Sequence, residues 1–328
     1  MTTTTTPPPS SVRWRSVAIF IAVAYALLAL CAAPFWFLAD GIAHPLYSWV
    51  LSVGMLTPTI ATLVVVKLVD KGSWRKEVGL RFRGRWKRVA LWIPLSVLLV
   101  LAINVASAVI MVLRGVPGDL TGRTWADTVS DSMTEAGAPL PQVAAIALVL
   151  AISAVNLLVT VVPALGEEIG WRGWLWQKLK PLGFLGALTA GGAIWSLWHL
   201  PIVLIGHNYP GAPRPLAIGM FLIACIAMNF LFGAITERSG GNPIPAAFAH
   251  ATVNSTLGLA IGIVATSETM DALNWFIDTP LGAIGIVLMV VAAYLIMPRR
   301  ARADFGAPAP ASAQHEVEWA DGQPLEAA

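Results

Sequence analysis

Long apolar segments separated by short polar ones occupy most of the chain. A helix crosses a bilayer with roughly 20 apolar residues. On this criterion the sequence predicts membrane helices near residues 17–39, 46–69, 89–113, 141–163, 183–205, 215–236, 243–264 and 280–297. We expect the fourth to continue as a helix past Arg172. The predicted fold is therefore all-α, a polytopic transmembrane bundle of about eight spans.

The composition favours a membrane protein over a soluble one. Hydrophobic residues make up 57% of the 328 positions and charged residues only 12%, and the mean hydropathy is +0.72. A soluble chain of this size could not bury so much apolar surface. Cys31 and Cys225 both lie in apolar segments, so we interpret them as packing residues rather than as a disulfide or a CxxC metal pair.

Both ends of the chain differ from the middle. Residues 1–16 begin with a run of Thr and Pro, and residues 299–328 are rich in Pro, Ala and Glu, so we predict two disordered tails. Residues 17–298 are then one bundle. No small-residue cleavage site clearly follows the first apolar segment, so we interpret it as a retained anchor rather than a signal peptide.

The basic residues are distributed unevenly between the predicted loops. If both termini are cytoplasmic, 18 of the 21 Lys and Arg residues face the cytoplasm, and those outside are Arg114, Arg123 and Arg214. This positive-inside asymmetry predicts cytoplasmic termini and an even number of spans in the cell membrane. We assign the basic run 67–88 to topology and to attraction for anionic lipids, not to nucleic acid. The expected partners are therefore membrane lipids.

Three tryptophans lie beside two lysines at the predicted cytoplasmic end of the fourth helix. Aromatic residues next to basic ones are typical of the membrane–water interface. We therefore interpret the group as an interfacial belt consisting of Trp171, Trp174 and Trp176, next to Lys178 and Lys180.

Few ionisable residues lie at membrane depth. Of 18 Asp and Glu residues, only Glu167 and Glu168 fall clearly inside a membrane-helix pattern, and of 5 His residues only His199 and His250 do. Ionisable groups are costly in a bilayer, so they indicate a functional site. We expect no role for the remaining histidines in loops and tail, which are His44, His207 and His315.

Helix geometry suggests how these polar residues are arranged. Glu168 and Arg172 are four residues apart, so they share a helix face and can form an ion pair. Glu167 points about 100° away around the helix and is left to face another element. His250 and Asn254 are also four apart and present an imidazole and an amide from one face.

The depths of the three clusters are compatible. The fourth and fifth helices are expected to turn near Gly183, and Glu167 and His199 each lie sixteen residues from it. At 1.5 Å per residue both lie roughly 24 Å from the turn and can face each other. His250 follows the turn at residues 240–241 by about ten residues, or roughly 15 Å. These levels match if the hairpin of the fourth and fifth helices projects about 9 Å further into the cytoplasm. We therefore expect one cavity nearer the cytoplasmic side.

These motifs bear a specific resemblance to a known family. The motif EExxxR beginning at Glu167, the pair Trp195-xxx-His199 and the motif HxxxN beginning at His250 follow one another in separate predicted helices. In order, spacing and placement they resemble the CPBP family, the CAAX proteases and bacteriocin-processing enzymes, also called the Abi family of intramembrane metalloproteases. The resemblance covers about residues 141–264. Trp195 stands where eukaryotic CAAX-processing members usually have Phe.

The resemblance implies a prokaryotic intramembrane endopeptidase that acts on a membrane-associated protein or peptide. The reaction would be CAAX-type C-terminal processing, or the maturation of or immunity to a bacteriocin or other peptide. Glu167 would activate a water molecule that His199 helps to hold, and His250 and Asn254 would stabilise the oxyanion. The supporting residues would be Glu168 and Arg172.

The metal requirement stays open at this stage. Proteases of this family are described both as metal-dependent and as using Glu and His without a tightly bound metal. Glu167, His199 and His250 could bind Zn²⁺ and leave one position open for water. The sequence has no HExxH motif, however, and these ligands would come from separate helices.

Two other classes of function compete with hydrolysis. A non-catalytic membrane scaffold that regulates partner proteins would tolerate replacement of Glu167 by Gln. A proton-coupled transporter could also use Glu and His relays. Transport predicts inverted repeats with broken helices in both halves, whereas the polar membrane residues all fall in the second half. We therefore rank transport last.

Overall fold

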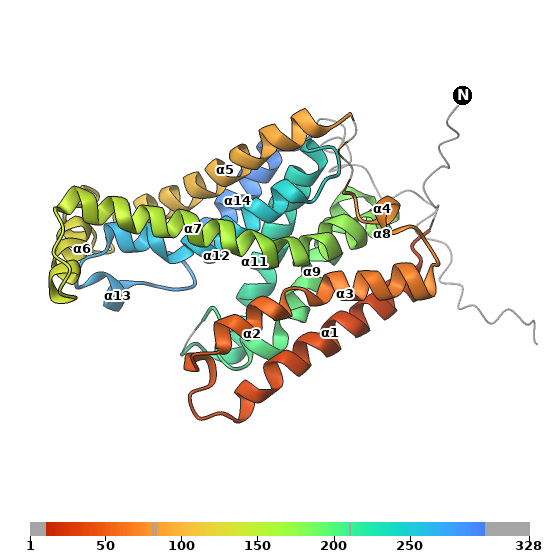
Figure 1. Cartoon of the computed structure of the whole chain (residues 1–328), viewed down its shortest axis with the longest axis horizontal. Coiled ribbons are helices and arrows are strands. Elements are labelled where there is room, and N and C mark those ends of the chain that lie inside the picture. Colours follow the sequence, from red (N-terminus) through yellow and green to blue (C-terminus); the bar gives the residue numbers. More distant parts are fainter. Residues whose placement is uncertain (1–10, 81, 83, 210, 299–328) are drawn as a thin grey trace, which may run out of the picture.

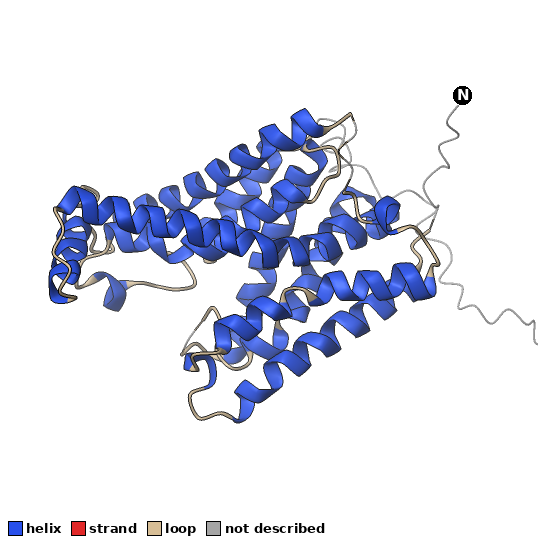
Figure 2. Ribbon diagram, viewed as in Figure 1, coloured by secondary structure: helices blue, strands red, loops and turns tan. Residues whose placement is uncertain are grey.

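The computed structural model describes residues 11–80, 82, 84–209 and 211–298, and its regular elements in these ranges are all helices (Figure 1; Figure 2). The all-α prediction is confirmed. Helix α1 begins at Trp14, inside the tail predicted over residues 1–16. Residues 1–10 of that tail and the whole of the tail predicted over residues 299–328 lie outside the described residues.

Six helical runs in the described part of the chain are long and apolar enough to cross a membrane, which makes this a multi-pass membrane protein. They are α1 (Trp14–Phe37), the run Tyr47–Val69, α5 (Trp86–Leu113), the run Gln142–Trp198, α11 (Arg214–Arg238) and α12 (Ile244–Val264). Helix α14 (Ala283–Ile296) is apolar but shorter. Each of the eight predicted spans corresponds to helix, but the number that cross the bilayer stays a prediction.

Two of the predicted spans are interrupted. The second consists of α2 (Tyr47–Gly54), α3 (Thr57–Val64) and a π-helical turn (Val65–Val69). The fifth consists of α9 (Gly183–Trp198) and the short α10 (Leu200–Val203), which meet at His199. A hydropathy pattern does not reveal such breaks, because the segments on either side of each break are equally apolar.

The fourth helix continues past Arg172, as predicted. Helix α7 (Gln142–Glu168) passes into a π-helical stretch (Ile169–Leu175), then α8 (Trp176–Leu179) and a 3₁₀ turn (Lys180–Leu182). Gly183 follows with φ +78°, a conformation that glycine adopts without steric cost. The chain reverses there into α9, which confirms the predicted turn near Gly183.

Figure 1 shows α1 to α3 in one arm and α5, α7 and α12 in another, which converge toward α8 and α9. Helix α12 packs on α5 and α7, α11 packs on α9 and α14, and α1 packs on α3. The arm with α5 and α7 also carries the short helices α6 (Arg123–Glu135) and α13 (Thr269–Ala272).

Two glycines allow α3 to lie directly against the start of the π-helical stretch. A Cβ atom on Gly170 would lie 2.4 Å from the Cβ of Pro58, and one on Gly166 would lie 3.1 Å from the carbonyl oxygen of Met55. Thr59 also donates its hydroxyl to the carbonyl of Gly166 over 2.5 Å. Small residues at four-residue spacing let membrane helices approach closely. This contact fixes the segment between them, Glu167 to Ile169, against α3.

We call one end of the bundle the basic end. The start of α1 meets the second span there, where Ser16 donates to Asp70 over 2.7 Å. Helix α4 (Trp74–Glu77) contacts α8 through the ion pair of Lys178 and Glu77 at 2.7 Å. The turn between α11 and α12 lies at the same end, because Arg85, just before α5, donates to the carbonyl of Gly240. The opposite end carries the connecting segments 38–46, 114–141, 204–209 and 265–282, two of which contain the short helices α6 and α13.

Candidate active site

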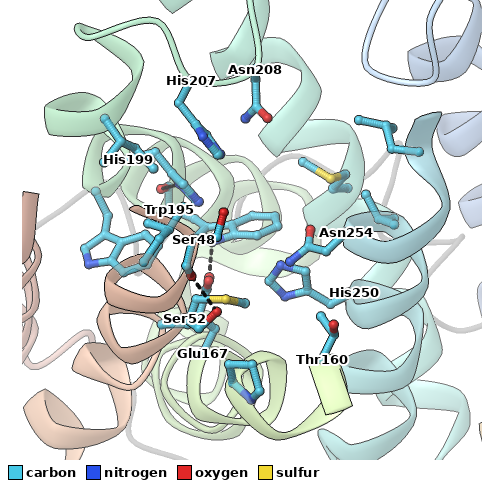
Figure 3. Close-up of a pocket in the computed structure, with 18 of the residues that line it drawn as sticks. Ser48, Ser52, Thr160, Glu167, Trp195, His199, His207, Asn208, His250 and Asn254 are labelled. Carbon is cyan, nitrogen blue, oxygen red and sulfur yellow. Dashed lines mark hydrogen bonds between the residues drawn. The ribbon is translucent and has the colours of Figure 1, made fainter. Parts of the chain in front are cut away.

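All four residues predicted to act in catalysis line one cavity of about 300 Å³ (Figure 3). Glu167 comes from the last turn of α7, and His199 from the junction of α9 and α10. His250 and Asn254 come from the same face of α12. The structure therefore brings together three clusters that are distant in the sequence. Their roles in a reaction stay predictions.

Glu167 is held by two tryptophans. The indole N–H of Trp195 donates to its Oε2 atom over 2.7 Å, and the indole N–H of Trp171 donates to the same atom over 3.1 Å. Trp195 comes from α9, so Glu167 faces a different helix, as predicted. Both bonds end on Oε2, so these indoles fix the plane of the carboxylate without using Oε1.

Glu168 and Arg172 form the predicted ion pair, and both side chains are fully buried. The Nη1 atom of Arg172 lies 2.8 Å from Oε1 of Glu168. The same oxygen lies 2.9 Å from Nδ1 of His250. Because a carboxylate accepts, Nδ1 of His250 donates and carries a proton. Glu168 thus orients the imidazole, a link that the sequence did not reveal.

Trp195 lies at the centre of the site. Its ring centroid is 5.3 Å from that of His250 and 5.7 Å from that of His199. The guanidinium of Arg172 lies 4.3 Å from the same ring, at cation–π distance. One indole therefore contacts the ion pair, both histidines and Glu167.

His199 is oriented by its own helix. Its Nδ1 atom lies 2.8 Å from the backbone carbonyl of Trp195. A carbonyl can only accept, so Nδ1 donates and Nε2 of the neutral ring is an acceptor. The ring also packs edge-on against Trp198 and Phe221, at centroid distances of 4.6 and 5.0 Å. His199 thus has a single defined orientation beside the cavity.

His207, for which we expected no role, also lines the cavity. Its Nδ1 atom lies 3.1 Å from the hydroxyl of Tyr47 at the start of α2. Burial lowers the pKa of His207 to about 4, so the ring is neutral near pH 7. Hydropathy places this residue in a loop and says nothing about whether the loop folds inward. The sequence offers a signal for this side of the cavity in Ser48 and Ser52. They are four residues apart in an apolar segment, so they share one helix face, and both line the cavity.

The interpretation of Trp171, Trp174 and Trp176 as an interfacial belt is wrong. Their exposed fractions are 3%, 0% and 4%. Trp171 donates to Glu167, and Trp176 donates to Glu237 over 2.8 Å. Tryptophan serves equally well at an interface and in a packed interior with a partner for its N–H. Here α1, α9 and α11 surround this segment, so the rings face protein.

The cavity extends from the site toward the end opposite the basic end. On α7 its lining runs back from Glu167 to Thr160, and on α12 it runs forward from His250 to Leu257. His250 follows the start of α12 by six residues, about 9 Å, so the site itself lies nearer the basic end. With the positive-inside orientation the cavity would therefore extend outward. The sidedness and the expected cytoplasmic opening stay predictions.

The predicted Zn²⁺ ligands do not form a recognisable metal site. Within the described ranges, no group of three or more His, Cys, Asp and Glu side chains is arranged to hold a metal ion. Nδ1 of His250 donates to Glu168, and Oε2 of Glu167 accepts two indole bonds, so Nε2 of His250 and Oε1 of Glu167 are the atoms left to meet an ion. A Zn²⁺ requirement stays a prediction from the sequence.

Residues 140–256 match the family model described as "Type II CAAX prenyl endopeptidase Rce1-like". All the predicted site residues, from Glu167 to Asn254, lie within that match. The match covers about a third of the chain, and over that part the chain is similar to this family. The chain is also 36% identical over 44 residues to "CAAX prenyl protease 2" of Methanococcus maripaludis, an alignment that covers 13% of this chain and 16% of that protein.

Proposed function

We propose that this chain is an intramembrane endopeptidase that hydrolyses a peptide bond in a membrane-associated protein or peptide. The observation that carries the proposal is the Glu167 carboxylate, held by two indole N–H groups in a cavity that His199, His250 and Asn254 also line. The match of residues 140–256 to a CAAX endopeptidase family supports the same class of reaction.

Glu167 is the proposed general base. Its Oε2 atom is engaged by Trp171 and Trp195, so Oε1 is the oxygen that accepts a proton from water. His199 offers Nε2 as an acceptor that orients this water. The water oxygen attacks the scissile carbonyl carbon while its proton passes to Glu167. Glu167 then returns the proton to the leaving nitrogen as the C–N bond breaks, so the base is regenerated.

His250 and Asn254 are the proposed oxyanion donors. Both face the cavity from one side of α12. His250 is held by the bond from its Nδ1 to Glu168, and Glu168 is in turn held by Arg172. A protonated His250 would therefore donate from Nε2, and Asn254 from its amide. Donors of this kind contribute roughly 10²–10³ in rate each.

The proposed substrate class rests on the comparisons. A curated relative is named a CAAX prenyl protease, which supports a substrate that carries a lipid near its C-terminus. Maturation of a bacteriocin or another membrane peptide, or immunity to it, is the second substrate class within the same chemistry. If Zn²⁺ is bound, Glu167, His199 and His250 would be its ligands, and the ion would polarise the water.

The test is proteolysis by the purified protein in liposomes, with a library of lipidated and unmodified membrane peptides. Wild type is compared with Glu167→Gln, His199→Ala and His250→Ala, each with and without a chelator. We expect cleavage by wild type and loss of cleavage in all three variants. Sensitivity of the wild type to the chelator would assign a metal. No cleavage by wild type, with an unchanged cellular phenotype in Glu167→Gln, would favour the non-catalytic scaffold.

A further inference from the structure

A second cavity, of about 450 Å³, lies at the basic end of the bundle, apart from the site of hydrolysis. It is formed by the segment before α5, by the 176–180 segment and by the turn between α11 and α12. Its lining is mostly charged and consists of Lys76, Glu77, Gly79, Arg85, Arg88, Gln177, Lys180, Glu237, Gly240 and Gly241. We call it the basic pocket.

The two acidic residues of the basic pocket already have cationic partners. Glu77 pairs with Lys178 at 2.7 Å, and Glu237 pairs with Lys180 at 3.0 Å. Among the residues that the structure describes, neither Arg85 nor Arg88 has a carboxylate within ion-pair distance. The pocket therefore carries two guanidinium groups whose charge no carboxylate of the described residues balances, and it favours an anion.

The pocket lies where membrane spans end. Span α5 begins at Trp86, α11 ends at Arg238 and α12 begins at Ile244. Arg85, Arg88 and the glycine pair 240–241 are each within four residues of one of these ends. Phospholipid headgroups occupy this level of a bilayer. Trp86, which is 60% exposed, is an aromatic residue of the kind found at that level.

The walls of the pocket are packed against one another. Gly79 has φ +69°, and a Cβ atom there would lie 2.6 Å from the carbonyl oxygen of Gly241. Arg85 reaches the same turn by donating to the carbonyl of Gly240. Glycine is required at this close approach. The pocket is thus formed by the fold and does not depend on exposed side chains meeting by chance.

The surface of α5 next to the pocket suits an acyl chain. Leu91, Leu95 and Leu98 follow Arg88 by three, seven and ten residues, so all four lie on one helix face. All three leucines are exposed. A lipid whose phosphate contacts Arg88 could therefore lay a hydrocarbon chain along this face, which free phosphate or a nucleotide would leave uncovered.

We propose that the basic pocket binds the phosphate of an anionic phospholipid headgroup, with Arg85 and Arg88 as its ligands and the leucine face of α5 beneath its acyl chains. This site is separate from the proposed protease chemistry and does not depend on it. A zwitterionic lipid, whose choline cancels the phosphate charge, is expected to bind less well.

The experiment is native mass spectrometry of the full chain in mild detergent. The protein is equilibrated with equal amounts of phosphatidylglycerol and phosphatidylcholine, and the retained lipids are counted. We expect wild type to retain phosphatidylglycerol preferentially. A basic residue that contacts a lipid headgroup contributes about five-fold in binding, so Arg88→Gln should lower the preference about five-fold and Arg85→Gln/Arg88→Gln about 25-fold.

The matched control is Arg13→Gln/Arg15→Gln. It removes the same charge from exposed positions at the basic end, outside the pocket, and should keep the preference within two-fold. Equal losses in the two double variants would overturn the site in favour of general attraction. So would a wild type without preference, or complete displacement of the lipid by millimolar glycerol phosphate. Among the residues that the structure describes, Arg88 has no hydrogen bond or ion pair with a partner in the fold, so its single variant tests the proposal even if Arg85→Gln misfolds.

Discussion

Trp195 donates its indole N–H to the Oε2 atom of Glu167 over 2.7 Å. A phenylalanine at position 195 would keep the aromatic wall of the cavity but would lose this bond. The arrangement makes Trp195 a positioning residue for the proposed base.

Replacement of Trp195 by Phe should lower kcat and leave KM within a few-fold. Hydrogen bonds to charged groups contribute about 1.5–3 kcal/mol, which corresponds to roughly 10–100-fold in rate. Steady-state cleavage of a peptide in liposomes measures both constants. The matched control is Trp198→Phe, which removes an indole that donates to Ala24 and Thr57 instead. Equal losses of kcat in the two variants would argue against a specific role for the bond to Glu167.

Removal of Arg172 should destabilise the fold strongly. Its guanidinium balances the buried carboxylate of Glu168, and loss of one partner of a buried pair costs about 3–5 kcal/mol. Denaturant unfolding of Arg172→Met in detergent would measure this. Glu168→Gln/Arg172→Met should recover part of the loss, because the carboxylate that Arg172 balances is then absent as well. Lys180→Met, which breaks a partly exposed pair with Glu237, should stay within about 1 kcal/mol.

His207 should make the stability of the protein depend on pH. Its folded pKa is about 4, below the usual value near 6.5, because of burial. Between these values the unfolded chain binds a proton that the folded chain does not. The contribution of neutral His207 to the free energy of unfolding is therefore present above pH 6.5 and is lost as the pH falls toward 4.

Melting temperatures measured from pH 7 to pH 4.5 should fall more in wild type than in His207→Gln. The comparison variant is His44→Gln, which changes a loop histidine that is not part of the cavity lining. Parallel curves for wild type and His207→Gln would contradict the assignment.

Asn254→Ala should lower kcat by roughly 10²–10³ if its amide stabilises the oxyanion. KM should change less, because the oxyanion forms in the transition state and is absent from the bound substrate. Ser255→Ala, one residue further along α12 and absent from the cavity lining, should retain activity. A variant Asn254→Ala with normal kcat would remove this residue from the mechanism.

The sequence predicts those features that depend on neighbours along one helix. Apolar runs locate the helices because a bilayer requires length and hydrophobicity together. The pairing of Glu168 with Arg172 follows from four-residue spacing, and the structure has it at 2.8 Å. The reversal at Gly183 was also predictable, because the apolar pattern breaks there.

Contacts between helices were beyond the sequence. The bond from His250 to Glu168 joins residues 82 positions apart, and no local spacing encodes it. Tryptophans 171, 174 and 176 were placed at an interface because the hydropathy of a ring does not say whether lipid, water or protein covers it. The inward position of His207 depends on how the segment 204–209 packs.

Gly170 has a significance that its chemistry would not suggest. Any side chain there would collide with Pro58 and push away the helix that carries Glu167. In a saturation mutagenesis screen scored for activity, this glycine should therefore tolerate as few replacements as the glutamate itself, although it has no group that could take part in a reaction. A site identified from such a screen would include a residue whose whole contribution is the absence of atoms.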